Sequence, residues 1–265
     1  MHLKTLLAGL SLRSATADME TEITHISYDS RTTAPGDVFV AMTGFATDGH
    51  AYIGKAVAAG AAAVVCERPP EDSSVPYVLV ENSRRALAVM AANYYGHPAD
   101  SMTMVAVTGT NGKTTTTYLL KAILEQELGA KVGLIGTNQD LIGDEVVPTE
   151  RTTPESLELQ ELFARMRSAG CTHVVMEASS HALALDRVYG IHYAVGIFTN
   201  LTQDHLDFHK TMEAYCDAKA ILFQNCDVGV CNADDPWTER LLQNAACRQY
   251  FYAEHAAADL RAEHI

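Results

Sequence analysis

Short runs of apolar residues alternate along this chain with stretches in which apolar positions recur every three or four residues. Apolar runs of four to six residues between turn residues predict strands, and the longer periodicity predicts helices. In the first third of the chain the pattern predicts strands at 23–28, 38–42, 61–66 and 75–80. It predicts helices at about 51–59 and at 82–95. We therefore expect a small α/β unit at the N-terminal end.

The rest of the chain repeats the alternation of strand and helix. Strands are predicted at 103–108, 131–136, 173–178, 193–199, 228–232 and 248–252. Helices are predicted at 113–128, 154–169, 211–224 and 236–245. This order is typical of a mostly parallel sheet with helices on both faces, in which ligands bind beyond the carboxyl ends of the strands. Residues 137–153 show neither pattern and are interpreted as a long polar connection.

The segment Gly96-His97-Pro98-Ala99-Asp100 is polar and rich in turn residues, and it separates the two patterns. A length of 265 residues is enough for about two domains. We therefore predict one domain over residues 1–97 and a second over residues 98–265.

Charge and composition exclude several classes of protein. The net charge is −14, and no basic face is apparent, so a nucleic-acid partner is not expected. No apolar run is long enough to cross a membrane. The six cysteines form no C-x-x-C pair and are interpreted as free thiols of a cytoplasmic protein.

The strand predicted at 103–108 runs directly into a glycine-rich turn and a helix. The sequence there is Val105-Ala-Val-Thr-Gly-Thr-Asn-Gly-Lys-Thr-Thr115. Backbone N–H groups of such a turn cradle phosphate oxygens, Lys113 is placed to reach the β- and γ-phosphates, and the Thr114 hydroxyl is a ligand for Mg²⁺. The general phosphate-loop pattern has glycine where this chain has Val107, and the alternative interpretation is an ordinary glycine-rich turn.

Two polar clusters follow other predicted strands. Glu177 ends an apolar strand, where an acid beside a phosphate loop is placed to hold Mg²⁺; the alternative is a solvated strand-end acid. The second cluster consists of Asn200, Asp204, His205, Asp207 and His209. His205 and His209 are four residues apart, but no H-E-x-x-H motif is present, so zinc protease chemistry is not expected.

Two further features have simple structural interpretations. Lys219 lies on an amphipathic helical stretch, where composition alone predicts an amine that reaches out to solvent. Thr153 and Pro154 suit the N-cap and first position of the helix that follows them. The turn Asp29-Ser30-Arg31 has an equally simple interpretation.

Taken together, these motifs resemble the Mur ligases of peptidoglycan synthesis. The resemblance is carried by Thr108–Thr115, Glu177-Ala-Ser-Ser-His181, Asn200-Leu-Thr-Gln-Asp-His205 and Ala218-Lys219. Tyr28-Asp-Ser-Arg31, Pro35–Gly44, Asp48-Gly49 and Arg151-Thr-Thr-Pro154 narrow it to the MurE type, a UDP-N-acetylmuramoyl-dipeptide:amino-acid ligase. The resemblance covers nearly the whole chain.

The resemblance implies a fold and a set of site residues. The family has a UDP-substrate domain, a central ATPase domain with a mostly parallel sheet, and a third domain; members extend beyond residue 265, so we expect an incomplete central domain and no third domain here. The implied ATP site is Gly109, Thr110, Asn111, Gly112, Lys113, Thr114 and Thr115. The implied substrate contacts are Tyr28, Ser30, Phe45, Ala46, Thr47, Thr152, Thr153, Ser179 and Arg187. The implied metal ligands are Thr114, Glu177, His205 and Lys219, with Lys113, His205 and Lys219 as catalytic residues and Lys219 carbamylated by CO₂.

The resemblance also implies a reaction. ATP phosphorylates the terminal carboxylate of UDP-N-acetylmuramoyl-L-alanyl-D-glutamate, and the amine of a free amino acid, meso-diaminopimelate or L-lysine, displaces phosphate from the acyl phosphate. Mg²⁺ is the implied cofactor, and we expect a cytoplasmic monomer that is inactive as residues 1–265 alone. The alternatives are a ligase similar to folylpolyglutamate synthase, whose loop has glycine in place of Thr114, and a non-catalytic nucleotide- or UDP-sugar-binding fragment.

Overall fold

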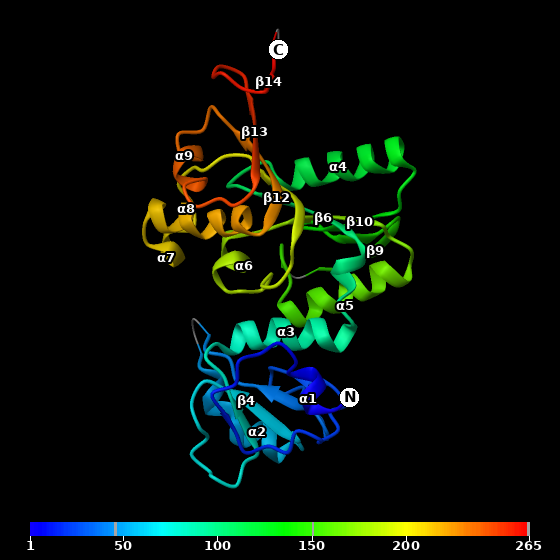
Figure 1. Ribbon diagram of the computed structural model, residues 1–265, viewed down its shortest axis with the longest axis vertical. Coiled ribbons are helices and arrows are strands. Elements are labelled where there is room, and N and C mark those ends of the chain that lie inside the picture. Colours follow the sequence, from blue (N-terminus) through cyan, green and yellow to red (C-terminus); the bar gives the residue numbers. More distant parts are fainter. Residues whose placement is uncertain (45–46, 150, 264–265) are drawn as a thin grey trace. The chain divides into compact units, whose positions relative to one another are not determined.

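The computed structural model describes residues 1–44, 47–149 and 151–263. The chain divides into two compact units, Met1–His97 and Pro98–Ile265. Each is described here by itself (Figure 1).

The first unit is a small α/β unit in which strands and helices alternate. Its elements are α1 Leu3–Leu6, β1 Ser14–Ala15, β2 Ile26–Ser27, β3 Val38–Val40, η1 Gly49–Tyr52, α2 Ile53–Ala58, β4 Ala63–Cys66, β5 Tyr77–Leu79 and α3 Ser83–Tyr95. Over its described residues the strands form a five-stranded sheet in the order β1-β5-β4-β3-β2, in which only the β1–β5 pair is antiparallel.

Strand alternation explains the core of this unit. Phe39 and Val64 point to one face of the sheet, where they pack against Ile53 and Ala56 of α2. The intervening residues of β3 and β4 are buried as well. Because both faces are covered, these strands read as continuous apolar runs.

The second unit is built on a larger sheet. Its strands are β6 Thr103–Thr108, β7 Val132–Ile135, β8 Asp140–Ile142, β9 Glu145–Val147, β10 His173–Glu177, β11 Tyr193–Phe198, β12 Cys226–Asn232, β13 Arg248–Ala253 and β14 Leu260–Arg261. Its helices are η2 Pro98–Ser101, α4 Lys113–Leu128, α5 Ser156–Ser168, α6 Ser180–Ala184, α7 Leu206–His209, α8 Met212–Ala220, η3 Ile221–Gln224 and α9 Thr238–Leu241. In the part of the chain that is described, the strand order is β14-β13-β12-β11-β6-β10-β7-β8-β9.

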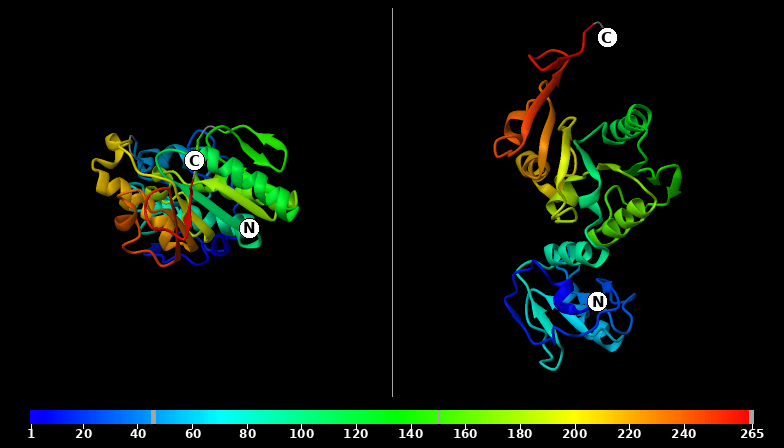
Figure 2. Two further views of the ribbon diagram at one scale, coloured as in Figure 1. Left: turned by 90° about the horizontal axis from the view of Figure 1, so that it is seen from above. Right: turned by 45° about the vertical axis from the view of Figure 1, so that its right-hand side comes forward.

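Over the described residues this sheet is parallel from β14 to β7 and antiparallel at β7–β8 and β8–β9. In β6, Val105 faces a cluster with Leu120 and Leu124 of α4, whereas Met104 and Ala106 face the cluster that holds Phe163 of α5. Helices therefore cover both faces, as Figures 1 and 2 show. The predicted α/β fold with a mostly parallel sheet is confirmed.

The expectation for residues 137–153 is wrong in part. Instead of one irregular connection, this segment holds the β8–β9 hairpin, in which Ile142 pairs with Glu145 across Gly143 and Asp144. Gly143 has a φ of 62°, which suits the tight turn. The hairpin forms because Leu141 and Ile142 are buried and β8 pairs with the edge of β7.

Several predicted elements are shorter than expected. The strand expected at 23–28 is confined to Ile26–Ser27, and the helix expected at 236–245 to Thr238–Leu241. The helix expected at 211–224 ends at Ala220 and continues as a 3₁₀ turn. Helix α5 begins at Ser156 with Glu155 as its cap. Thr153 is therefore not the cap, because its hydroxyl bonds to the end of β10 instead.

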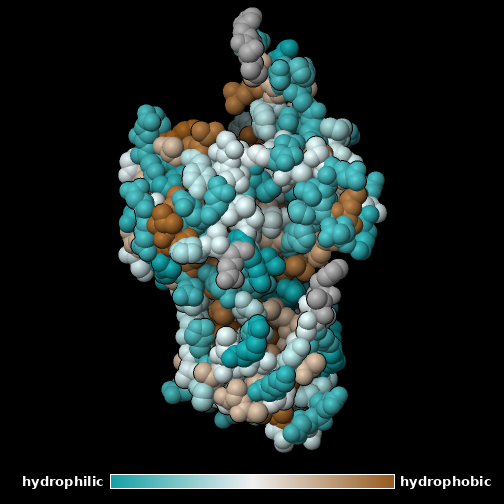
Figure 3. All heavy atoms as spheres, turned by 180° about the vertical axis from the view of Figure 1, so that it is seen from behind, coloured by the Kyte–Doolittle hydropathy of each residue, from teal (hydrophilic) through white to brown (hydrophobic). Residues whose placement is uncertain are grey.

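The surface carries mostly polar side chains. On the face in Figure 3, apolar side chains form separate small patches within a hydrophilic surface. Among the described residues, no helix is long and apolar enough to cross a membrane. All six cysteines are free thiols, as predicted.

Candidate active site

The glycine-rich turn lies at the carboxyl end of β6 and opens α4. Gly109 has a φ of 144°, and a Cβ there would lie 1.9 Å from Oγ1 of Thr199. Gly112 has a φ of 85° and is the N-cap residue of α4. Glycine is required at both positions, and at Gly109 for a second reason, since the chain after β11 passes directly against it.

The chain after β11 fixes this loop from one side. Asn200 accepts a hydrogen bond from the Asn111 N–H at 3.0 Å through Oδ1, and its carbonyl accepts one from the Thr110 N–H at 2.8 Å. The Thr199 hydroxyl donates to the Asn111 carbonyl at 2.7 Å. The polar cluster after β11 therefore positions the glycine-rich loop.

Lys113 closes over its own loop. Its Nζ donates to the carbonyls of Gly109 at 3.0 Å and Thr110 at 2.9 Å. Burial lowers the pKa of the Lys113 amine, and Glu177 and Asp204 oppose that shift. The first N–H groups of α4, at Lys113, Thr114 and Thr115, have no partner within the helix. A cation and free N–H groups thus converge where an anion would bind.

Glu177 is the buried acid beside this loop. Glu177 is the last residue of β10, which pairs with β6 in the sheet, and it is 1% exposed. The Thr114 hydroxyl donates to Oε1 of Glu177 at 2.9 Å. The structure therefore brings together the hydroxyl and the carboxylate that the sequence placed at separate strand ends.

Thr152, Thr153, Ser179 and Arg187 gather around the same strand end. The Thr153 hydroxyl donates to the Glu177 carbonyl at 2.8 Å and accepts from the Ser179 N–H at 3.2 Å. Arg187 Nη1 donates to the Thr153 carbonyl at 3.2 Å, and its Nε lies 3.3 Å from Oε2 of Glu155. Thr153, Ser179 and Arg187 thus form one polar cluster at the end of β10, and the Thr152 hydroxyl lies 3.0 Å from that of Thr137.

Lys219 is buried, not solvent-reaching. It is 1% exposed, and its Nζ donates to the Gly109 carbonyl at 2.9 Å. The same nitrogen lies 4.5 Å from the ring centroid of Tyr215, one helical turn earlier in α8. Burial, and then the positive charge of Lys113, lower the pKa of Lys219 to about 7. The interpretation of Lys219 as a solvent-reaching lysine is therefore wrong, because α8 faces the loop at this position.

His205 is a second neighbour of the Tyr215 ring. It precedes α7 with a φ of 52°, and its ring centroid is 4.9 Å from that of His181 and 6.1 Å from that of Tyr215. His209 has a different partner, since its Nε2 is 2.9 Å from the Ser180 hydroxyl. Burial lowers the pKa of His181 and lowers that of His209 to about 4, so both rings are neutral near pH 7.

The side chains of the site offer ligands for one hard cation more clearly than for a second one. A hydroxyl and a carboxylate lie in contact at Thr114 and Glu177, and Mg²⁺ commonly takes one or two such groups together with substrate phosphates. His205 and an unmodified Lys219 offer no second carboxylate. In the described ranges, no group of three or more His, Cys, Asp or Glu side chains could hold a metal by itself.

The candidates in the first unit follow two neighbouring strands. Tyr28 and Ser30 follow β2, and Thr47 follows β3; parallel pairing puts both strand ends at one edge. The turn after Tyr28 is held by Arg31, whose hydrogen bonds to the Asp29 carboxylate lower the pKa of Asp29. Phe45 and Ala46 lie outside the described residues.

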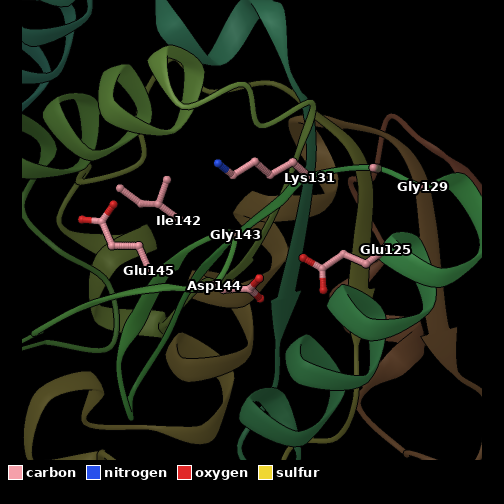
Figure 4. Close-up of a pocket in the computed structure, with 8 residues that line it drawn as sticks. Glu125, Gly129, Lys131, Ile142, Gly143, Asp144 and Glu145 are labelled. Carbon is pink, nitrogen blue, oxygen red and sulfur yellow. The ribbon is translucent and has the colours of Figure 1, made fainter.

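A separate pocket lies at the opposite edge of the second unit's sheet, where β7 begins (Figure 4). It has a volume of about 620 Å³ and is lined by the end of α4 and the β8–β9 turn. Its charged lining residues are Glu125, Lys131, Asp144 and Glu145. None of the predicted site residues contributes to it.

Sequence reasoning missed two residues that shape the site. Thr137 donates to both oxygens of Glu177, and Tyr215 has both the Lys219 amine and the His205 ring as neighbours. Tyr215 carries a weak signal, since it precedes Lys219 by four residues on a helix. Thr137 carries none, because it lies in a segment without a motif.

Comparison with known proteins places these features in one family. Residues 107–265 match the Mur ligase middle domain, and residues 22–95 match the Mur ligase family catalytic domain. A UDP-N-acetylmuramoyl-L-alanyl-D-glutamate--2,6-diaminopimelate ligase of Clostridium tetani is 47% identical over 269 residues, covering 100% of this chain and 55% of the relative. One of the same name from Listeria monocytogenes is 41% identical with the same coverage.

Solved structures give the same picture. A structure of a UDP-N-acetylmuramoyl-L-alanyl-D-glutamate--2,6-diaminopimelate ligase matches with a TM-score of 0.81 and 26% identity, covering 98% of this chain and 54% of that one. A MurF ligase from Thermotoga maritima in complex with ADP shares the fold, with a TM-score of 0.55, 24% identity and coverage of 88% and 51%.

The chain spans about half the length of the curated relatives it matches. The middle-domain match extends over more than half of the chain and includes the glycine-rich loop, Glu177 and Lys219. The chain therefore belongs to the Mur ligase family.

Proposed function

We propose that the whole protein containing these residues is an ATP-dependent ligase that joins 2,6-diaminopimelate to UDP-N-acetylmuramoyl-L-alanyl-D-glutamate. The observation that carries the proposal is the contact of the Thr114 hydroxyl with the buried Glu177 carboxylate beside a phosphate loop. A nucleotide site and a polar cluster meet at this point, as a phosphoryl transfer to a second substrate requires.

The loop residues bind the nucleotide. The free N–H groups at the start of α4 meet phosphate oxygens, and Lys113 exchanges its two carbonyl contacts for the β- and γ-phosphates. Its ammonium offsets the repulsion between the anionic nucleotide and an anionic carboxylate. This assigns Gly109 through Thr115 to ATP.

The cluster around Ser179 binds the dipeptide end of the other substrate. Arg187 supplies the cation for a carboxylate, and the hydroxyls of Thr152 and Ser179 supply further donors. The carboxylate oxygen attacks the terminal phosphorus of ATP, which breaks its bond to the bridging oxygen and releases ADP. The amine then attacks the acyl phosphate carbonyl, and phosphate leaves with the bonding electron pair.

Thr114 and Glu177 would hold Mg²⁺ in the loaded enzyme. When bound, this ion supplies charge neutralisation on the transferred phosphoryl group. We assign His205 and Lys219 to a second ion, with Lys219 converted to a carbamate.

The conversion of Lys219 is supported by its surroundings. A pKa of about 7 leaves a substantial share of the amine neutral at neutral pH, and only a neutral amine adds CO₂. The ammonium first loses one proton. The neutral nitrogen then forms an N–C bond to CO₂ and loses a second proton, so that a cation becomes an anion. The product offers oxygen ligands where the unmodified residue offers only a positive charge.

The choice of substrates rests on the relatives. Those in Clostridium tetani and Listeria monocytogenes are named for UDP-N-acetylmuramoyl-L-alanyl-D-glutamate and 2,6-diaminopimelate. We assign the uridine nucleotide to the edge of the first unit that carries Tyr28, Ser30 and Thr47. Phe45 and Ala46 belong to the same assignment by resemblance.

The proposal is tested by phosphate release from the whole protein with ATP, Mg²⁺ and the UDP-linked dipeptide. We expect release that depends on diaminopimelate, and much weaker release with L-lysine. Release that needs a folate instead of the UDP-linked dipeptide would support the folylpolyglutamate synthase alternative. Binding of both substrates without amine-dependent release would support a binding protein.

A further inference from the structure

The turn after β7 packs directly against the side chain of Glu177. Gly136 is buried, and a Cβ added to it would lie 2.5 Å from Oε1 of Glu177. The φ of Gly136 is not in the left-handed region, so the reason for glycine here is space. The carboxylate therefore rests on the backbone of this turn.

Thr137 holds both oxygens of that carboxylate. Its backbone N–H donates to Oε1 of Glu177 at 2.9 Å, and its hydroxyl donates to Oε2 at 3.1 Å. The same hydroxyl lies 3.0 Å from that of Thr152. Contact with both oxygens fixes the rotation of the carboxylate, which a single hydrogen bond would leave free.

Asp140 anchors the turn from its other side. It is 3% exposed and accepts a hydrogen bond from the Gly136 N–H at 3.1 Å through Oδ1. Its carboxylate also has the Thr149 hydroxyl as a hydrogen-bonding neighbour. Asp140 thus ties the turn after β7 to the segment that leads into Thr152.

We propose that Thr137 and Asp140 are positioning residues, which orient the Glu177 carboxylate toward Thr114 and so set the affinity of the nucleotide site for Mg²⁺. The inference rests on the proposed function, since it takes Glu177 as a ligand of that ion. Groups that hydrogen-bond to a metal-ligating carboxylate commonly change metal affinity about 10- to 100-fold when removed.

The burial of Asp140 supports this role. Burial raises the pKa of Asp140 to about 6, so near neutral pH its charge is held at a cost. Burial disfavours the charged form of this carboxylate, so its presence is explained better by a functional role than by a gain in stability. The role that the structure offers for Asp140 is to hold this turn through its hydrogen bonds to Gly136 and Thr149.

The test uses two matched pairs of variants in the 265-residue chain. Thr137→Val removes the hydroxyl and keeps the shape, whereas Thr137→Ser keeps the hydroxyl. Asp140→Ala removes the acceptor for the Gly136 N–H, whereas Asp140→Asn keeps a carbonyl oxygen in its place. Asp144→Ala, at an exposed position of the β8–β9 turn, is the control for altering the hairpin.

The measurement is calorimetric titration of each protein with AMPPNP, once with MgCl₂ and once with EDTA. We expect Thr137→Val and Asp140→Ala to weaken the Mg²⁺-dependent affinity about tenfold or more and to leave binding in EDTA within about twofold of wild type. Thr137→Ser, Asp140→Asn and Asp144→Ala should change the Mg²⁺-dependent affinity by less than about threefold. A general loosening of the site would weaken both titrations together.

Three results would overturn the inference. Wild-type protein that binds AMPPNP equally with and without Mg²⁺ would overturn the proposed metal site and this inference with it. Mg²⁺-dependent wild-type binding that Thr137→Val leaves unchanged would overturn the positioning role alone. Equal losses of AMPPNP affinity in MgCl₂ and in EDTA would mean that the turn supports the fold and does not position Glu177. If Asp140→Ala does not fold, the comparison of Thr137→Val with Thr137→Ser tests the inference.

Discussion

Replacing Asp140 by asparagine should change how the stability of the second unit depends on pH. Asp140 is 3% exposed, and burial raises its pKa from 3.8 to about 6. The raised pKa means that the folded protein binds more protons than the unfolded chain between these values. Stability therefore falls as the pH rises through this window, and the cost is fully present above about pH 6.

The magnitude follows from the two pKa values. The interval from 3.8 to about 6 corresponds to about 3 kcal/mol, at about 1.4 kcal/mol per pH unit. The asparagine side chain of the variant stays neutral at every pH and imitates the protonated acid. Relative to wild type, Asp140→Asn should therefore gain about 2 kcal/mol of unfolding free energy between about pH 4 and about pH 6.5, out of about 3 kcal/mol over the full titration.

Urea denaturation followed by tryptophan fluorescence measures this difference. The chain has one tryptophan, Trp237, which lies half-buried in the same unit as Asp140. Any constant effect of the amide group cancels, because only the change with pH is compared, and the other acids titrate alike in both proteins. A difference that is flat across this window, or that falls as the pH rises, would refute the assignment of a costly buried charge to Asp140.

Three other substitutions test the proposed nucleotide site. In the whole protein, Lys113→Ala should lower turnover by roughly two to three decades, since a lost contact to a transferring group costs about 3–4 kcal/mol, while calorimetry shows unchanged UDP-substrate affinity. Lys219→Ala should abolish turnover, and added short-chain carboxylic acids should restore part of it. Wild-type turnover by this alanine variant in CO₂-depleted buffer would exclude a carbamate. Gly109→Ala should abolish AMPPNP binding by the 265-residue chain, because its Cβ would lie 1.9 Å from Thr199; an unchanged titration would contradict the loop geometry.

The sequence located the glycine-rich loop and the polar strand ends because these signals are local. Gly-Lys-Thr directly after an apolar strand predicts a phosphate loop, and strand ends place Glu177 and Asn200 at the same edge. The structure has β6 between β10 and β11, which brings these three strand ends together. Parallel sheet topology alone accounts for that much.

Other features depend on contacts that no local pattern carries. The hydroxyl of Thr153 looked like a helix cap, yet it bonds to Glu177, far away in sequence. Lys219 looked like a surface lysine because its helix is amphipathic, and only the packing of α8 against the Gly109 carbonyl buries it. The β8–β9 hairpin did leave a local signal, in which Gly143-Asp144-Glu145 separates Leu141-Ile142 from Val146-Val147.

The most direct test of the proposed reaction follows the oxygen atoms of the dipeptide. The whole protein is given ATP, Mg²⁺, diaminopimelate and UDP-N-acetylmuramoyl-L-alanyl-D-glutamate labelled with ¹⁸O in its terminal carboxylate, and the released phosphate is examined by mass spectrometry. If that carboxylate attacks the terminal phosphorus of ATP, its oxygen leaves with the phosphate when the amine displaces it. We predict one ¹⁸O atom in each phosphate released. Formation of the ligated product together with unlabelled phosphate would contradict an acyl phosphate at this site.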